Sequence, residues 1–245
     1  MLCFVFYNRY YFIVISTAAC KSAKSGDSSK LSSIELEYLE ELGVLDPTHN
    51  NIDGEIISVS KTKVSEKDIY GYEPRGPIGT NYKTMYVTVT RINAPGYDQF
   101  QLDSYFKWDR TPFFGGTDGI ALAWSDNFTM TYSAMTLYYK GEHFTGYNSG
   151  LAYLSGTAPE VGVGYAFPIR YNTASNTSVN LDNGTIRARV RKHDSTGTAN
   201  MVAKYVHTKI GLTGPSFSYD KSGPTIGVSL GLTYDHREIS AHWAH

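Results

Sequence analysis

Between Phe100 and Tyr139, large apolar residues alternate with polar or small ones, and this pattern constrains the fold more than any other part of the chain. A period of two is typical of β-strands, because successive side chains point to opposite faces. Turn-forming residues at 111–119 and at Asp126–Asn127 divide the block into three strands. We expect its interior to contain Phe106, Ile120, Leu122, Trp124, Phe128 and Met130.

Composition extends this prediction to the whole chain. The 245 residues include 20 tyrosines and 23 glycines, which favour strands and tight turns over helices. Sandwiches and barrels of this size often form one domain. We therefore predict an all-β protein over residues 34–245, an antiparallel β-sandwich that is jelly-roll-like. The net charge of -1 provides no field for nucleic acid, so no nucleic-acid partner is expected.

Residues 1–19 have the pattern of a secretory signal peptide, with a single charge at Arg9, an apolar run at 10–15 and small residues at 16–19. The run is about half of the roughly 20 residues that span a bilayer. The predicted location is therefore extracellular or at the cell surface. Residues 20–33 are rich in Ser, Lys and Gly, and we expect a flexible linker.

The cysteine at the end of the signal allows two outcomes. Thr17-Ala18-Ala19-Cys20 resembles a bacterial lipobox, in which the cysteine thiol is acylated after cleavage. Such motifs usually open with an aliphatic residue, whereas this one opens with Thr17. The flexible composition that follows suits a tether behind a lipid anchor, so Cys20 is the predicted lipidation site and the only predicted membrane contact. Ordinary signal cleavage near Ala18 or Ala19 is the alternative.

A short amphipathic helix is predicted at 34–42. Ser32 and Ser33 can cap its start, and Gly43 follows its end. Leucines and one isoleucine recur at helical spacing, while glutamates occupy the other side. We expect this helix to lie against one end of the sandwich.

Three arginines at alternate positions form the clearest charged pattern of the chain. Arg187, Arg189 and Arg191 share one face of a strand predicted at 179–192, ~7 Å apart by strand rise. They form a candidate anion-binding row, for an anionic ligand or a lipid headgroup; a solvated strand face protected from edge pairing is the alternative. We expect a turn at 182–184 and a hairpin partner at 201–210.

No catalytic signature is present, so enzymatic activity is not favoured. The sequence lacks the Gly-x-Ser-x-Gly pattern of Ser hydrolases. Both cysteines, Cys3 and Cys20, precede the body of the chain, which excludes a Cys-ligated metal there. The C-terminal histidines match no metal-binding spacing, and we predict no metal and no cofactor.

A binding module fits the sequence better than an enzyme. Aromatic residues supply flat faces that can stack on sugar rings, and nearby Asp and Asn residues can bond to hydroxyl groups. We predict recognition of a glycan or another cell-envelope component by the exposed part of this block. The candidate ligand-binding residues are Trp108, Asp109, Arg110, Phe113, Phe114 and Asp118.

Two other functions remain open. Ser/Thr alternation at 129–136 and a Gly/Ser-lined strand at 225–234 resemble the amphipathic hairpins of β-pore-forming proteins. A β-sandwich glycoside hydrolase would need two carboxylates about 5–10 Å apart. Its candidate residues are Asp103, Asp109, Asp118, Glu142 and Glu160.

Overall fold

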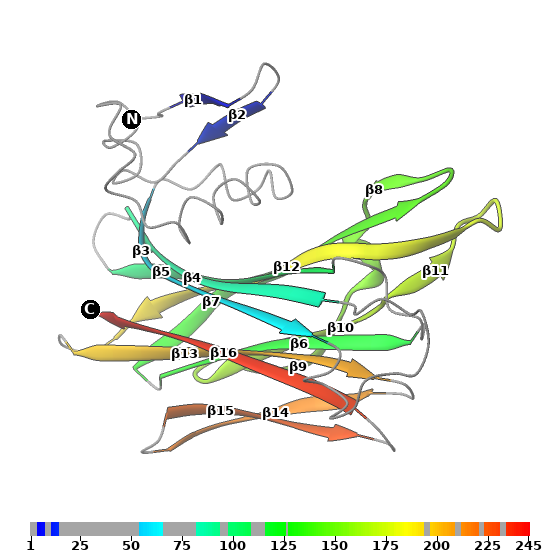
Figure 1. The fold of residues 1–245 in the computed structure, drawn as a ribbon. Coiled ribbons are helices and arrows are strands. Elements are labelled where there is room, and N and C mark those ends of the chain that lie inside the picture. The colour runs from blue at the N-terminus through cyan, green and yellow to red at the C-terminus, as the bar shows by residue number, and fades with distance from the viewer. Residues whose placement is uncertain are drawn as a thin grey trace.

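The computed structural model describes most of the chain from residue 54 onward (Figure 1). The described residues are 4–7, 11–14, 54–65, 82–93, 98–108, 116–125, 127–193, 197–208, 212–220, 223–230 and 234–245. The predicted helix at 34–42, the linker with Cys20, and residues 109–115 lie outside them. In the segment predicted as a signal peptide, β1 (Phe4–Tyr7) pairs with β2 (Tyr11–Val14).

Two antiparallel sheets form the body of the protein, and no α-helix occurs in the described residues (Figure 1). The larger sheet has the order β3 (Gly54–Ser65), β4 (Tyr82–Ile92), β5 (Gln99–Trp108), β12 (Ser178–Lys192), β7 (Phe128–Gly141), β8 (Thr145–Tyr147), with β11 (Arg170–Asn172) also beside β12. The smaller sheet has the order β16 (Tyr234–Ala244), β13 (Thr198–Thr208), β6 (Thr117–Trp124), β10 (Gly162–Pro168), β9 (Tyr153–Ala158). A 3-10 turn, Ser149–Leu151, follows β8. The predicted antiparallel β-sandwich is confirmed.

Aromatic side chains from both sheets fill the space between them. Phe106 of the larger sheet stacks on Phe167 of the smaller, with ring centroids 5.6 Å apart, and meets Tyr205 edge-on at 4.7 Å. The predicted interior is confirmed for Phe106 and for its companions in β6 and β7, with Met130 partly buried against the core. Each such ring removes a large apolar area from water, and edge-on pairs add to that gain.

The three strands predicted between Phe100 and Tyr139 are β5, β6 and β7, but they do not pair with one another in order. β5 and β7 both flank β12, whereas β6 lies in the facing sheet. Inward residues of β5 and β6 therefore reach one core from opposite sides. Residues Phe100 to Phe106 of β5 are all buried, so this strand is covered on both faces.

Two of the predicted connections are wrong. The segment 201–210 was expected to pair with the arginine strand, but β13 pairs with β6 and β16, while β12 pairs with β5 and β7. The expected turn at 182–184 lies inside β12, where the ladder to β7 shifts register between Leu181 and Asn183. Polar residues with a glycine are typical of turns and of bulges alike, and a neighbouring strand on each side keeps this segment extended.

A separate two-stranded ribbon forms a third layer. It consists of β14 (Leu212–Asp220) and β15 (Gly223–Leu230) and lies against the outer face of the smaller sheet, in contact with β6, β9, β10 and β13 (Figure 1). The face beneath it carries little beyond backbone. In β6 and β10 its buried residues are Gly119, Ala121, Ala123, Gly162, Gly164 and Ala166, and β13 adds the buried Val206, which pairs with Gly119.

Gly184 is a position where the core leaves no room for a side chain. A Cβ atom there would lie 2.8 Å from the Phe106 ring, 2.9 Å from the Thr136 carbonyl oxygen and 3.0 Å from Leu137 Cδ2. Backbone and aromatic neighbours cannot yield as the tip of a flexible side chain can.

We predict that Gly184→Ala lowers the free energy of unfolding by about 1–3 kcal/mol, because overpacking forces neighbours away from their preferred positions. The matched control is Gly150→Ala, whose new Cβ would lie no closer than 3.7 Å to its neighbours. Urea unfolding monitored by tryptophan fluorescence measures both variants. Equal stability of the two would contradict this account of the packing around β12.

Candidate functional site

Two of the predicted ligand-binding residues, Trp108 and Asp118, lie together in the interior. Trp108 is 4% exposed and Asp118 0%. Trp108 Nε1 donates to the Tyr205 hydroxyl at 3.3 Å, and that hydroxyl donates to Asp118 Oδ2. His207 Nδ1 lies 2.8 Å from Asp118 Oδ1. The other predicted residues of this set, Asp109, Arg110, Phe113 and Phe114, lie outside the described residues.

This interior cluster acts as a structural element. Burial, reinforced by the negative charge of Asp118, raises the pKa of Tyr205 well above its usual value, so the phenol stays neutral and keeps donating to the carboxylate. His207 is 5% exposed, and its ring meets Trp108 edge-on at 5.8 Å. These contacts hold Trp108 and Asp118 in the interior of the described part of the sandwich.

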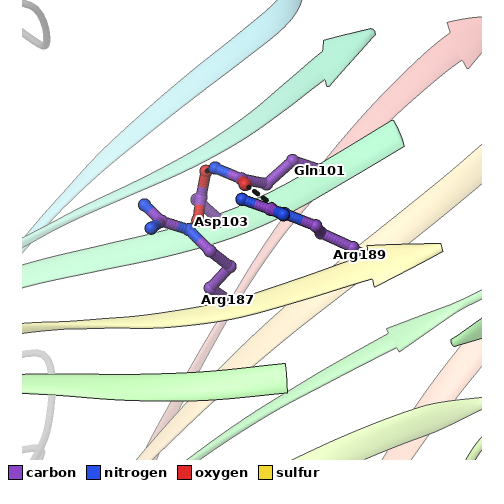
Figure 2. Close-up of polar contacts among 4 residues, drawn as sticks. All are labelled: Gln101, Asp103, Arg187 and Arg189. Atoms are coloured by element: carbon purple, nitrogen blue, oxygen red, sulfur yellow. Dashed lines mark hydrogen bonds and ion pairs between the residues drawn. The ribbon is translucent and has the colours of Figure 1, made fainter. Parts of the chain in front are cut away.

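The arginine row lies on the outer face of the larger sheet and is divided by burial. Arg187 Nε donates to Asp103 Oδ1 at 2.7 Å, with side-chain exposures of 7% and 0% (Figure 2). Gln101 Nε2 donates to the other carboxylate oxygen at 2.7 Å. A buried carboxylate is tolerated only when it is paired and hydrogen-bonded, and Asp103 meets both conditions.

Arg189 connects this buried network to the surface. Its Nε donates to Gln101 Oε1 at 3.2 Å, which uses one of its five N–H donors (Figure 2). The guanidinium lies over the ring of Tyr132, 5.3 Å from the centroid. This cation–π contact and the bond to Gln101 together fix the plane of the guanidinium before any ligand arrives. The third arginine, Arg191, is exposed further along β12.

Three tyrosines share the outer face with Arg189, and one of them, Tyr132, lies directly beside it. We name the surface of Tyr132, Tyr138 and Tyr147 the tyrosine face. Tyr132 is 49% and Tyr147 40% exposed, while Tyr138 is half-buried and meets Tyr147 edge-on at 5.0 Å. Tyr132 and Tyr138 are six residues apart on β7, or about 20 Å by strand rise. Between them the same face carries only the small residues Ala134 and Thr136.

Charged and amide groups border one end of the tyrosine face. Lys140 Nζ lies 5.7 Å from the centroid of Tyr138 and 2.9 Å from Asp182 Oδ1. On the neighbouring strand, Arg170 Nε donates to Asn180 Oδ1 at 2.8 Å. An elongated row of rings with donors and acceptors at its border is suited to binding.

Sequence patterns contained a signal for this surface. Met135, Leu137 and Tyr139 are buried in the core, so the intervening positions of β7 must face outward. Tyr132 and Tyr138 occupy such positions and do not contribute to the core. The residue type alone misled, because aromatic residues in strands are usually interior: Tyr105, Trp124 and Tyr139 are indeed fully buried.

The described residues contain no cluster of three His, Cys, Asp or Glu side chains that could hold a metal ion. The carboxylates considered for glycoside hydrolysis do not form an open pair there. Asp103 is buried in an ion pair with Arg187, Asp118 is buried within hydrogen-bond distance of His207, and Glu142 and Glu160 lie exposed in connecting segments. Among the same residues, no helix is long and apolar enough to cross a membrane.

No protein-family model matches this sequence, and no curated protein matches it either. Among solved structures, the chain is similar to a pore forming protein (TM-score 0.33, 8% identity, covering 78% of this chain and 96% of that one). It is also similar to the Clostridium perfringens NetB toxin in the membrane inserted form (TM-score 0.34, 10% identity, 77% and 96%). A third is the KRT10-binding region domain of the pneumococcal protein PsrP (TM-score 0.33, 9% identity, 71% and 99%). Likenesses of this size assign no family.

We predict that Asp103→Asn lowers the free energy of unfolding by about 3–5 kcal/mol, because it leaves the buried Arg187 without its carboxylate. The matched control is Asp182→Asn, which removes a partly exposed ion pair with Lys140 and is expected to cost no more than about 1 kcal/mol. Chemical unfolding at neutral pH compares the two. A loss for Asp103→Asn as small as that of the control would show that the network does not hold the outer face.

Proposed function

We propose that this chain is an exported cell-surface protein that binds a glycan through the tyrosine face. The observation that carries the proposal is the exposure of Tyr132 and Tyr147 on a sheet whose other described aromatic side chains are buried or half-buried. Tyr147 meets Tyr138 edge-on, and exposed apolar patches bordered by polar residues typically mark binding sites. A sugar ring offers C–H groups to such rings and hydroxyl groups to the polar side chains around them.

The charges around the face favour an acidic glycan. Arg189 is fixed over Tyr132 by its bond to Gln101, and Lys140 lies against Tyr138. A planar guanidinium can bond to a carboxylate through two parallel N–H groups, which neither a hydroxyl nor a lysine can match. Uronic and sialic acids combine such a carboxylate with an apolar ring face. An extended oligosaccharide would run along β7 from Tyr132 to Tyr138.

The location remains part of the proposal. It is supported by the signal-like segment at 1–19 and by the flexible composition of 20–33. Lipidation at Cys20 would place the sandwich on a tether at the membrane. The intact mass of protein isolated from its native host distinguishes a diacylated Cys20 from a chain that is simply cleaved nearby.

We predict that Tyr132→Ala and Arg189→Gln each weaken binding of an acidic oligosaccharide at least about ten-fold, or 1.4 kcal/mol. The first removes the ring and the second the fixed cation, and both lie away from the core. Arg189→Lys should recover little, because an ammonium group cannot form the planar pair. Isothermal titration with oligosaccharides selected on a glycan array measures the affinities.

Tyr153→Ala is the matched control for these variants. Tyr153 is 52% exposed but lies on β9 of the other sheet, so its loss should leave the affinity unchanged. An array with no bound glycan would sink the proposal. An equal loss of affinity for Tyr132→Ala and Tyr153→Ala would show that the glycan does not bind at the tyrosine face.

A membrane-active role is the second candidate function, and the β14–β15 ribbon is the specific feature that favours it. The ribbon forms no ladder with either sheet in the part of the chain that the structure describes. Its sequence alternates as a lipid-exposed hairpin does.

A further inference from the structure

The β14–β15 ribbon is a separate sheet whose pairing is in register with the ladder between β13 and β16. The last described pair of that ladder joins Thr208 to Tyr234, and the first pair of the ribbon joins Leu212 to Leu230. Four positions separate these pairs on both strands, so the register is preserved between them. A shift of one residue follows before Pro215 pairs with Val228. The pairs of the two ladders therefore follow the order of a single long β-hairpin.

The outer half of this hairpin is folded back onto the sheet. In a straight ribbon, Ile226 would lie eight residues beyond Tyr234, or about 26 Å past the end of the ladder. Instead its carbonyl oxygen accepts a hydrogen bond from Lys204 Nζ at 2.9 Å, and Lys204 lies within β13. Figure 1 shows the ribbon beneath the sheet that contains β13 and β16.

Packing of side chains, without a ladder, holds the ribbon in this position. Ile226 is 3% exposed and packs on Ala121 and Ala123, with Val202 beside them. Alanine and glycine offer few atoms for dispersion contacts. Because the ribbon is a separate sheet, its release breaks none of the strand pairings within either sheet of the sandwich. Release of a strand of the sandwich would instead break all the backbone hydrogen bonds to its neighbouring strand.

The two sides of the ribbon differ in polarity along its whole length. Residues paired in a ladder share one side of it, and the pairs on the side of Ile226 are apolar: Pro215 with Val228, Phe217 with Ile226, Tyr219 with Pro224. The pairs on the other side are small or polar: Ser216 with Gly227, Ser218 with Thr225, Asp220 with Gly223. Such a dyad repeat is what a strand needs when one side faces lipid and the other faces water.

We infer that the β14–β15 ribbon is a stored membrane-inserting hairpin, which swings out from the smaller sheet and enters a lipid bilayer with its Ile226 side toward the acyl chains. Its strands have nine and eight residues, close to the roughly 9–11 that span the hydrocarbon core when tilted. Backbone groups at the edges of a lone hairpin would remain unsatisfied in lipid. Hairpins from several copies of the chain must therefore close into a continuous cylinder of strands.

A disulfide that locks the ribbon to the sheet tests this inference. In a background with Cys3→Ser and Cys20→Ser, the double variants Ala121→Cys/Ile226→Cys and Ala123→Cys/Ile226→Cys tie the ribbon to β6. The probe is dye release from vesicles of phosphatidylcholine with and without phosphatidylglycerol. We expect the cysteine-free background to release dye, the oxidised locked proteins to lose this activity, and dithiothreitol to restore it.

The matched control is Ser216→Cys/Gly227→Cys, which links the two strands of the ribbon at a register pair and leaves the ribbon able to leave the sheet. It should release dye when oxidised. Absence of release by the cysteine-free background from either vesicle would overturn the inference. So would release by the oxidised locked proteins at the rate of the control.

Single-cysteine variants carrying an environment-sensitive fluorophore provide a second test. Labels at Phe217→Cys and Val228→Cys should brighten when vesicles are added, and labels at Ser218→Cys and Gly227→Cys should not. Labels that respond alike on both sides would contradict insertion as a two-faced ribbon. Since neither test uses a glycan, failure here leaves the proposed glycan binding intact, and failure on the glycan array leaves this inference intact.

Discussion

The buried ion pair between Asp103 and Arg187 is the interaction on which the outer face of the larger sheet depends. It joins the two central strands of that sheet on the side opposite the aromatic core. Two ions in this position are acceptable only with short, complete bonding, which Gln101 extends to Arg189. The orientation of Arg189 over Tyr132 therefore depends, through Gln101, on the buried carboxylate of Asp103 on the neighbouring strand.

Alternation was sufficient to predict the fold class and much of the core, because a period of two fixes which residues share a face. It could not predict which strands are neighbours. β12 and β13 follow one another in sequence and both alternate well, yet they lie in different sheets. Partner choice depends on the volume and shape of the whole interior, which no single strand encodes.

The candidate site was harder to predict than the fold for a related reason. Trp108 and Asp118 have the residue types of a ligand-binding surface, but Tyr205 and His207 satisfy them inside the protein. These partners come from a strand about ninety residues later, so no local pattern announced the cluster. Conversely, the tyrosine face was missed because Tyr139, an aromatic residue of the same strand, is buried in the core, and residue type alone does not distinguish it from the exposed Tyr132.

The most direct test of the tyrosine face is to observe the tyrosine rings themselves during a titration. Ring resonances of selectively labelled tyrosine are followed by NMR as an acidic oligosaccharide is added. We predict shifts at Tyr132, Tyr138 and Tyr147, with Tyr153 and the interior Tyr205 unchanged. Saturable binding that shifts Tyr153 and leaves the three rings of β7 and β8 unmoved would contradict the account.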